Sequence, residues 1–291
     1  MKSLIIGAWS IGVYLWTLLF DGGNDIILCW RSKLDILWKS IKINEDTYTL
    51  PPSISKVVQD ESYDFVFVTC KIYDIIPVLE TLKEHNIQAK HRVFIQNWII
   101  PVSLKNEIQT YGDFNSISVF EWYRLVESVL ITQQTSVWRK IDDTPSWKIV
   151  ADILSGVGIN CSTIANLDQT RAEKTIMNCS VNVLSAIYEK TFFEIFSDDE
   201  LLNRTKDIFF ETHSVLLKKI ELTNVELLRD SFSSFAKPMK HYSSTHQDIS
   251  TGHRTEIEFL NQLIVELWIE YNIPTPHNDK IMKEFTNMTA E

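Results

Sequence analysis

Residues 3–12 read SLIIGAWSIG, an apolar run that leads into two glycines, Gly7 and Gly12. A strand, a tight turn and a helix in this order, at the start of a chain of alternating elements, are typical of a dinucleotide-binding βαβ unit. In that unit the first glycine permits the turn, the second lets a pyrophosphate approach bare backbone, and the third lets helix and strand pack closely. Trp9 stands where the second glycine is expected. The stretch by itself therefore fits an ordinary βα turn as well.

Composition narrows the class of protein. The chain has 291 residues, of which 45% are hydrophobic and 23% charged, so it is long enough for two domains. Its formal net charge of −10 without a long basic run argues against a nucleic-acid partner. Four widely spaced cysteines favour reduced thiols over a disulfide framework or a zinc site. No stretch approaches the roughly 18 apolar residues of a membrane span, so we expect a cytoplasmic protein without membrane contact.

The hydrophobic pattern changes period along the chain. Short apolar strands are predicted at residues 25–29, 65–69, 93–95 and 159–166, helices at 75–85 and 147–154, and a β-rich region at 117–137. From residue 171 onward the period becomes helical, with helices predicted at 174–193, 198–220, 224–235 and 255–272. The sequence therefore predicts the α/β class, with an N-terminal Rossmann-like dinucleotide-binding domain at residues 1–167 and an all-α C-terminal domain at 168–291.

Polar side chains follow three of the predicted strands. Arg31 comes just after the second strand, where an acid favours NAD and a cation accommodates the 2′-phosphate of NADP. A solvated arginine at a strand end is the alternative. Lys71 and Asn97 follow the next two strands, and the carboxyl ends of parallel strands border the ligand crevice of such sheets. Their position in the sheet makes both residues site candidates.

Three polar residues share one face of a predicted helix. Lys174, Asn178 and Asn182 fall at i, i+4 and i+8, and their neighbours are largely apolar. An unsatisfied buried amide costs roughly 1–3 kcal/mol and a buried charge more, so these groups need partners. A substrate would supply them, and so would a polar seam against the first domain.

A second polar string lies at residues 242–261, YSSTHQDISTGHRTEIEFLN. Ser243 and Ser244 open it and Gly252 marks a break. Thr255 is placed to cap the helix that follows, with Glu256 near the positive end of that helix. Capping accounts for Glu256 but not for the whole string.

Taken together, these motifs carry a family resemblance. The string at 242–261, the NIPTP segment at 272–276, the stripe of Lys174, Asn178 and Asn182, and SLIIGAWSIG with Arg31, Lys71 and the pair at 96–97 resemble the ketopantoate reductase (2-dehydropantoate 2-reductase) family. The similarity spans the whole chain in the right order. It implies that NADPH delivers a hydride to 2-dehydropantoate, giving D-pantoate for pantothenate and coenzyme A synthesis.

The resemblance also implies roles for individual residues. Lys174 would protonate the carbonyl oxygen as general acid and stabilise its negative charge, and Glu256 would orient substrate and lysine. No metal is required. Substrate contacts are implied for Asn97, Asn178, Asn182 and Ser244, and cofactor contacts for Gly7, Ala8, Trp9, Ser10, Ile11, Gly12, Arg31, Lys71, Asn97 and Glu256.

The chain departs from the family pattern at four places. Trp9, Trp98 and the bulky segment 120–123 lie along the expected cofactor path, and Phe192 stands where a polar residue is common in the substrate region. We favour a retained but altered reductase, because a non-catalytic chain has little need of Lys174 and Glu256 together. The alternatives are a reductase of a different 2-keto acid, a non-catalytic metabolite-binding relative with an obstructed cofactor groove, and an interaction protein whose tryptophans meet a partner. The expected partner is a small 2-keto acid, and a homodimer is left open.

Overall fold

The computed structural model describes residues 1–29, 40–50, 53–54, 57, 59–96, 102–119, 123–126, 128–132 and 139–290. The chain divides into two compact units, Met1–Leu167 and Asp168–Glu291. The first is α/β and the second all-helical, which confirms the predicted fold class. Within the described ranges, no helix combines the length and the apolar character that crossing a bilayer requires.

The first unit is built on an eight-stranded sheet with the strand order β12-β11-β8-β7-β6-β1-β2-β5. All described neighbours pair in parallel except β11 with β8, which are antiparallel. The antiparallel β11 was not predicted. The strands are β1 (Lys2–Ile6), β2 (Asp25–Cys29), β5 (Ser53–Ile54), β6 (Ser62–Val68), β7 (Gln88–Ile95), β8 (Phe114–Val119), β11 (Arg139–Asp142) and β12 (Cys161–Ile164).

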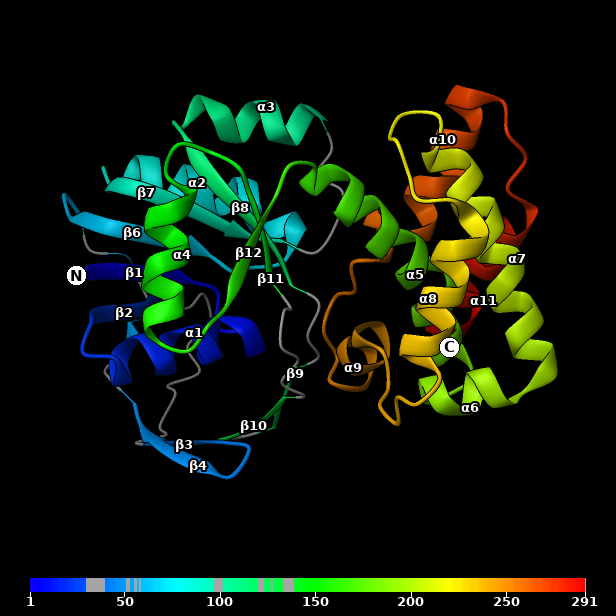
Figure 1. The fold of residues 1–291 in the computed structure, drawn as a ribbon, viewed down its shortest axis with the longest axis horizontal. Coiled ribbons are helices and arrows are strands. Elements are labelled where there is room, and N and C mark those ends of the chain that lie inside the picture. The colour runs from blue at the N-terminus through cyan, green and yellow to red at the C-terminus, as the bar shows by residue number, and fades with distance from the viewer. Residues whose placement is uncertain are drawn as a thin grey trace. The chain divides into compact units, whose positions relative to one another are not determined.

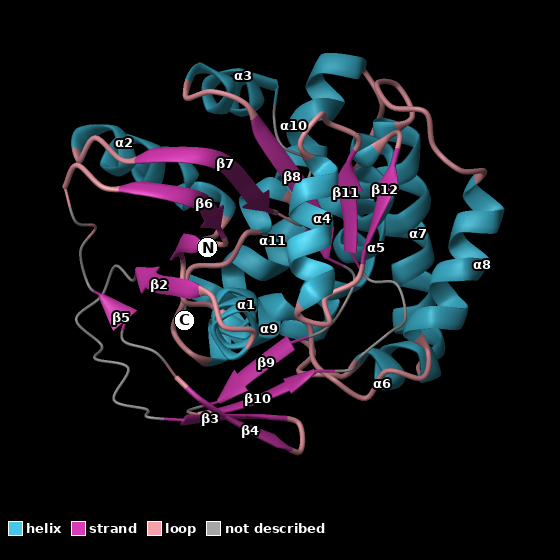
Figure 2. Cartoon of the chain, turned by 60° about the vertical axis from the view of Figure 1, so that its left-hand side comes forward, coloured by secondary structure: helices cyan, strands magenta, loops and turns pink. Residues whose placement is uncertain are grey.

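Helices cover both faces of this sheet, with α1 on one face and α2 and α3 on the other (Figures 1 and 2). Alternate strand residues such as Ile5, Phe67 and Ile95 join one core with α1 and α4. A smaller sheet, of order β4-β3-β10-β9, adds Ile41 and Leu130 to that core. The helices are α1 (Ser10–Asp21), α2 (Ile75–Glu84), α3 (Val102–Thr110) and α4 (Trp147–Gly156), and the small sheet comprises β3 (Ser40–Ile43), β4 (Asp46–Thr49), β9 (Tyr123–Val126) and β10 (Val129–Thr132).

The turn between β1 and α1 depends on its two glycines. Gly7 has φ +112°, and a Cβ there would lie 2.6 Å from the backbone nitrogen of Cys70. A Cβ on Gly12 would overlap the carbonyl oxygen of Gly7 and lie 2.6 Å from Oγ1 of Thr69. The backbone of α1 therefore approaches the ends of β1 and β6 more closely than any side chain would allow.

The second unit is a bundle of helices (Figure 1), in which the middle of α5 is buried. The predicted helix 174–193 is wrong at both ends, because α5 starts earlier and stops before Glu189, which has φ +49°. The predicted helix 255–272 is also wrong at its start, since Leu260, with ψ −113°, separates a 3₁₀ turn from α10. The elements are α5 (Leu167–Ile187), α6 (Phe192–Ser197), α7 (Asp199–Leu216), α8 (Val225–Ala236), α9 (Ser244–Ser250), η2 (Ile257–Phe259), α10 (Asn261–Tyr271) and α11 (Pro276–Ala290).

A buried polar network ties four of these helices together. Nδ2 of Asn261, at the start of α10, donates to the Cys179 carbonyl of α5 (2.9 Å) and to Oδ1 of Asn278 in α11 (3.0 Å). Asn278 in turn donates its backbone N–H and its side-chain amide to Oε2 of Glu211 in α7, both at 2.7 Å. Buried amides whose donors are used in this way favour one arrangement of the bundle. Because the helix is interrupted at Leu260, Asn261 is the first residue of α10, and its side chain takes part in this network.

We expect Gly12→Ala to lower the free energy of unfolding by about 3 kcal/mol or more, because its Cβ forces the β1–α1 turn away from β6. Gly156→Ala is the matched control, since a Cβ at this last residue of α4 meets nothing within 4 Å. It should be neutral or slightly stabilising. Urea denaturation of the two variants measures both effects, and equal stabilities would contradict the close-approach argument.

Candidate active site

In the first unit, the predicted cofactor residues that the structure describes lie where the parallel strands end. The Thr69 hydroxyl donates to the Gly7 carbonyl (2.7 Å), and Nε2 of Gln96 donates to the Cys70 carbonyl (3.0 Å). These bonds fasten the carboxyl ends of β1, β6 and β7 to one another. The sheet edge that bears Gly7 and Lys71 is therefore a fixed platform.

The N-terminus of α1 lies at this edge of the sheet. Trp9 is its N-cap residue, in an extended conformation, and its side chain makes no capping hydrogen bond. The first turn carries no acidic residue. A helix N-terminus with these properties presents backbone N–H groups and partial positive charge, which suit an anion.

The indole that replaces the expected glycine lies beside a cation. Nζ of Lys71 is 5.3 Å from the centroid of the Trp9 ring, within the range of a cation–π interaction. Both side chains are partly exposed. The structure therefore brings together two predicted cofactor residues, one from the turn after β1 and one from the segment after β6.

In the second unit, the predicted stripe lies along α5. Asn182 is buried, with 3% of its surface exposed, whereas Lys174 and Asn178 are partly exposed. The helix is closely packed around them, because Ile176, Cys179 and Val183 are fully buried. The stripe is thus the polar part of a core helix.

The electrostatics of Lys174 involve two neighbours within this unit. Loss of hydration lowers the pKa of Lys174 to about 7, and the positive charge of Arg171 acts in the same direction. The negative charge of Glu256 opposes both and raises the pKa. An amine in this environment exchanges its proton near neutral pH, which suits general acid–base chemistry.

The two serines at the start of α9 differ. Oγ of Ser243 donates to the Asn182 carbonyl (2.9 Å) and accepts from the His246 backbone N–H (3.0 Å), while its own N–H donates to Oγ of Ser185 (3.0 Å). Ser243 is therefore a buried cap that fastens α9 to α5. Ser244, the first residue of α9, is exposed beside this attachment.

Comparison with known proteins identifies the family. The model of "Ketopantoate reductase PanE/ApbA" matches residues 3–103, and that of its C-terminal domain matches residues 166–288. The chain belongs to the ketopantoate reductase family. The resemblance predicted from the motifs is thereby confirmed.

Curated members of the ketopantoate reductase family match along almost the whole chain. A 2-dehydropantoate 2-reductase of Aquifex aeolicus is 25% identical over 307 residues, covering 97% of this chain and 95% of that protein. One of Pyrococcus abyssi is 25% identical over 287 residues, covering 96% and 94%.

Solved structures share the fold at lower identity. A PanE/ApbA family ketopantoate reductase from Ralstonia eutropha has a TM-score of 0.86 at 21% identity, covering 98% of this chain and 97% of that one. D-mandelate dehydrogenase with NADH and anilino(oxo)acetate has a TM-score of 0.88 at 18% identity, covering 99% and 97%.

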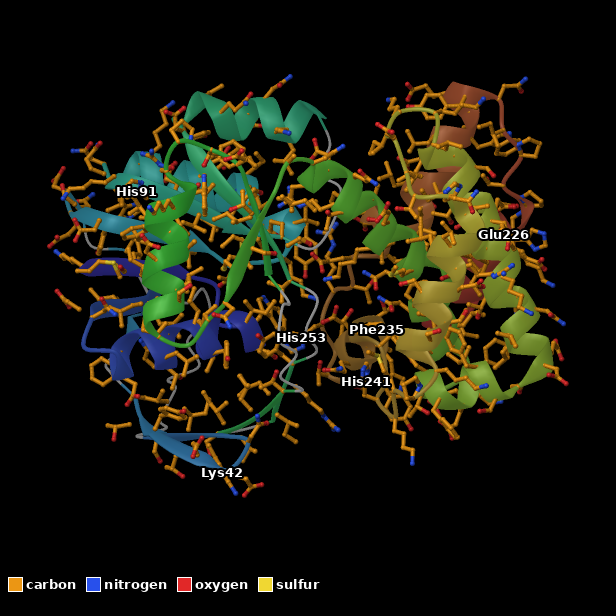
Figure 3. The ribbon with its side chains drawn as sticks, in the orientation of Figure 1. Lys42, His91, Glu226, Phe235, His241 and His253 are labelled. Atoms are coloured by element: carbon orange, nitrogen blue, oxygen red, sulfur yellow. The ribbon has the colours of Figure 1, made fainter. Side chains whose placement is uncertain are left out.

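Several positions where this chain departs from the family pattern can be placed. Phe192, buried at the start of α6, packs against the ring of His241 with centroids 5.1 Å apart, and its N–H donates to the His241 carbonyl (3.2 Å). His241 belongs to the helical unit, as Figure 3 shows. Tyr123, from the bulky segment, packs on Tyr14 in the core, with ring centroids 5.0 Å apart. Arg31, Asn97, Trp98 and residues 120–122 lie outside the described residues.

Arg171 was missed in the sequence analysis. Its side chain is buried, with 2% of its surface exposed, and its charge acts on Lys174. The signal was present, because Arg171 precedes Lys174 by three residues and so shares its helix face.

We expect Ser243→Ala to lower the free energy of unfolding by about 1–2 kcal/mol, because it removes a helix cap and leaves buried partners unsatisfied. Ser244→Ala, next to it in sequence but exposed, should change stability by less than about 0.5 kcal/mol. Denaturant titration compares the two. Equal losses would contradict the separate roles of the two serines.

Proposed function

We propose that this protein reduces 2-dehydropantoate to D-pantoate with NADPH, and that Lys174 is the general acid. The observation that carries the proposal is the lowered pKa of Lys174, about 7, on a helix face that also bears Asn178 and Asn182. Reduction of a ketone requires a proton at the carbonyl oxygen, and a partly buried amine near neutrality is a suitable donor. Family membership supports the reaction class.

The residues of the first unit fit a dinucleotide. Gly7 and Gly12 allow α1 to start close to the sheet, and the first turn of α1 is free of acidic residues, so its N–H groups suit a pyrophosphate. Lys71, held beside Trp9, adds positive charge at the same edge. A bound nicotinamide cofactor would supply the hydride. The preference for NADPH over NADH rests on Arg31, whose cation would accommodate the 2′-phosphate. The fold does not decide it, because the structurally similar D-mandelate dehydrogenase was solved with NADH.

The second unit supplies the groups for a 2-keto acid. Protonated Lys174 donates to the carbonyl oxygen as negative charge develops there, and Glu256 holds the ammonium in place by its charge. The amides of Asn178 and Asn182 and the hydroxyl of Ser244 would hold the carboxylate and the hydroxyl of the substrate. Lys174 and Asn182 lie about two turns apart on α5, with Asn178 between them, so polar groups follow one another along this helix face.

A second candidate is a reductase of a different 2-keto acid. It is favoured by Phe192, which is buried against His241 where the family pattern is polar. An apolar ring in that region favours a substrate with an apolar side chain over one with a hydroxyl, because a hydroxyl needs a hydrogen-bond partner when buried. Turnover on 2-dehydropantoate and on simpler 2-keto acids distinguishes the two candidates.

We expect Lys174→Ala to lower kcat for NADPH-dependent reduction of 2-dehydropantoate by about 10²–10⁴-fold, the contribution of a general acid. The dissociation constant of NADPH should change by less than about threefold, because the proton donor contributes to the reaction step and not to cofactor binding. Lys218→Ala, an exposed lysine on the same unit, is the control. A decrease of less than about twofold for Lys174→Ala would refute the role. Absence of NADPH binding at millimolar cofactor would instead favour the non-catalytic metabolite-binding relative.

The rate should also depend on pH in a defined direction. A general acid acts in its protonated form, so the single-turnover rate should fall as pH rises through the Lys174 pKa of about 7. Glu256→Gln removes a charge that raises this pKa and should move the decline to lower pH. Arg171→Met removes a charge that lowers the pKa and should move the decline to higher pH. Shifts in the same direction for both variants would contradict the assignment.

A further inference from the structure

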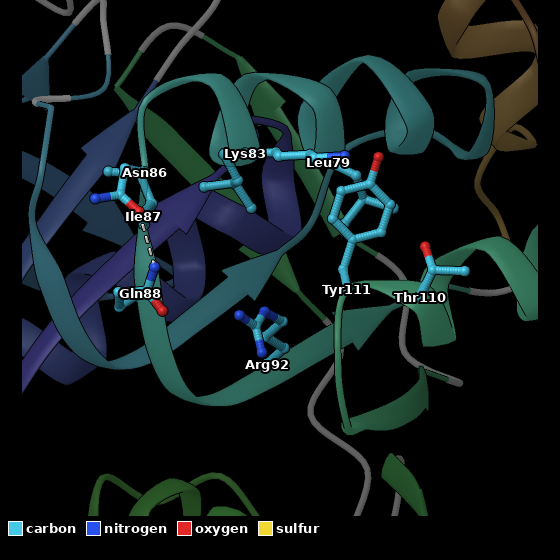
Figure 4. A pocket seen from close by; sticks show the side chains of 9 residues that line it. Leu79, Lys83, Asn86, Ile87, Gln88, Arg92, Thr110 and Tyr111 are labelled. Carbon is cyan, nitrogen blue, oxygen red and sulfur yellow. Dashed lines mark hydrogen bonds between the residues drawn. The ribbon is translucent and has the colours of Figure 1, made fainter.

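A cavity of about 280 Å³ lies in the first unit between the C-terminal ends of α2 and α3 and the beginning of β7. Polar side chains surround it. Figure 4 shows Arg92 on the strand, Lys83 on α2, Tyr111 to one side and Gln88 to the other. The apolar side chains of Leu79, Leu82 and Ile87 complete the wall.

This cavity is separate from the edge of the sheet that bears the proposed cofactor residues. Arg92 is the fifth residue of β7, and Gln96 follows the carboxyl end of that strand. Four residues of strand span about 13 Å. None of the described residues that are predicted to bind cofactor or substrate lines the cavity. The proposed reductase function therefore gives this pocket no role.

The guanidinium of Arg92 is partly withdrawn from water without a counter-charge. Within the described ranges, no hydrogen bond or ion pair joins its side chain to another residue. Burial lowers the pKa of Arg92, and no charged neighbour in the described part of the chain contributes to the shift. A desolvated cation without partners costs free energy, and a bound anion would remove that cost.

Within the described ranges, no carbonyl at the helix ends beside Arg92 accepts a hydrogen bond from its side chain. The Leu82 and Lys83 carbonyls accept from the Ile87 and Asn86 N–H groups (2.8 and 3.0 Å), and the Ile108 carbonyl accepts from Tyr111 (3.0 Å). Each helix C-terminus carries about half a negative charge, which the two full charges of Arg92 and Lys83 exceed.

The surroundings of the cavity include the carboxylate of Asp60. Its Oδ1 accepts from Nδ2 of Asn86 (2.8 Å), but Asp60 does not line the cavity. Gly112, with φ +111°, leaves the space that the guanidinium occupies, since a Cβ there would lie 3.0 Å from Nη1 of Arg92. The backbone that follows α3 therefore passes close to this guanidinium.

We propose that this cavity binds the phosphate group of a small phosphomonoester, with Arg92 and Lys83 as its charged ligands. The planar fork of Arg92 matches two phosphate oxygens, and Lys83 adds a second charge at the rim. A phosphomonoester carries about two negative charges near neutral pH, whereas a carboxylate carries one, so a pair of cations selects the dianion. The Tyr111 hydroxyl and the Gln88 amide are further donors. The apolar wall suits the organic part of the ligand.

Calorimetric titration of the full chain with phenyl phosphate tests the proposal. Arg92→Gln should weaken binding by about tenfold or more and Lys83→Gln by about threefold or more. Lys148→Gln, which removes an exposed charge from α4 of the same unit, should change the affinity by less than about twofold. Acetate at matched ionic strength should bind at least about tenfold more weakly than phenyl phosphate, because it carries a single charge.

One further variant and one further measurement show whether phosphate binds at this pocket or elsewhere on the protein. Lys71→Gln alters the proposed cofactor edge and should leave phenyl phosphate binding intact; if it abolishes binding while Arg92→Gln does not, the proposal is overturned. Without phosphate, Arg92→Gln should melt at or above the wild-type temperature, because it removes an uncompensated cation. A lower melting temperature together with unchanged phosphate affinity would make Arg92 a structural residue. No saturable binding of phenyl phosphate, or equal binding of acetate, would also overturn the proposal.

Discussion

Helix α5 has to be buried in the bundle while carrying a lysine and two asparagines, and the organisation of the second unit follows from that requirement. Asn261 and Ser243 donate to carbonyls of α5 and fasten α10 and α9 against it. These attachments bring the segment of Glu256 within electrostatic reach of Lys174. Burial of the amine lowers its pKa. Stability and the proposed chemistry therefore share one helix.

A comparable constraint acts in the first unit at the turn after β1. The close approach of α1 to Thr69 and Cys70 requires glycine at two positions, and these are the two that the chain retains. At the position between these two glycines, where the nucleotide-binding pattern has a third glycine, Trp9 lies beside the ammonium of Lys71. The indole thus has a partner within the unit. Its substitution for glycine changes the surroundings of Lys71 and leaves the geometry of the turn intact.

The proposed phosphate pocket has another physical origin. The protein carries a net charge of −10, yet both Arg92 and Lys83 line one cavity that is lined, among the described residues, without a carboxylate. In a chain with this charge, a local concentration of cations attracts anions that the remaining surface repels. The pocket and the proposed cofactor edge lie at different places along β7, so the two proposed anion sites would depend on different residues.

The sequence determined the fold class, the turn glycines and the stripe on α5, because these depend on hydrophobic period, on backbone freedom and on residue spacing, all of which are local. It did not determine that residues 255–272 break at Leu260, since the buried Asn261 bonds to α5 and α11. It also did not determine where α5 ends, because the left-handed Glu189 beyond that end is not a glycine. The separate positions of Ser243 and Ser244, the effect of Arg171 on Lys174 and the desolvation of the Arg92 guanidinium likewise required the packed structure. Burial and charge proximity join residues far apart in the chain, and no local pattern encodes them.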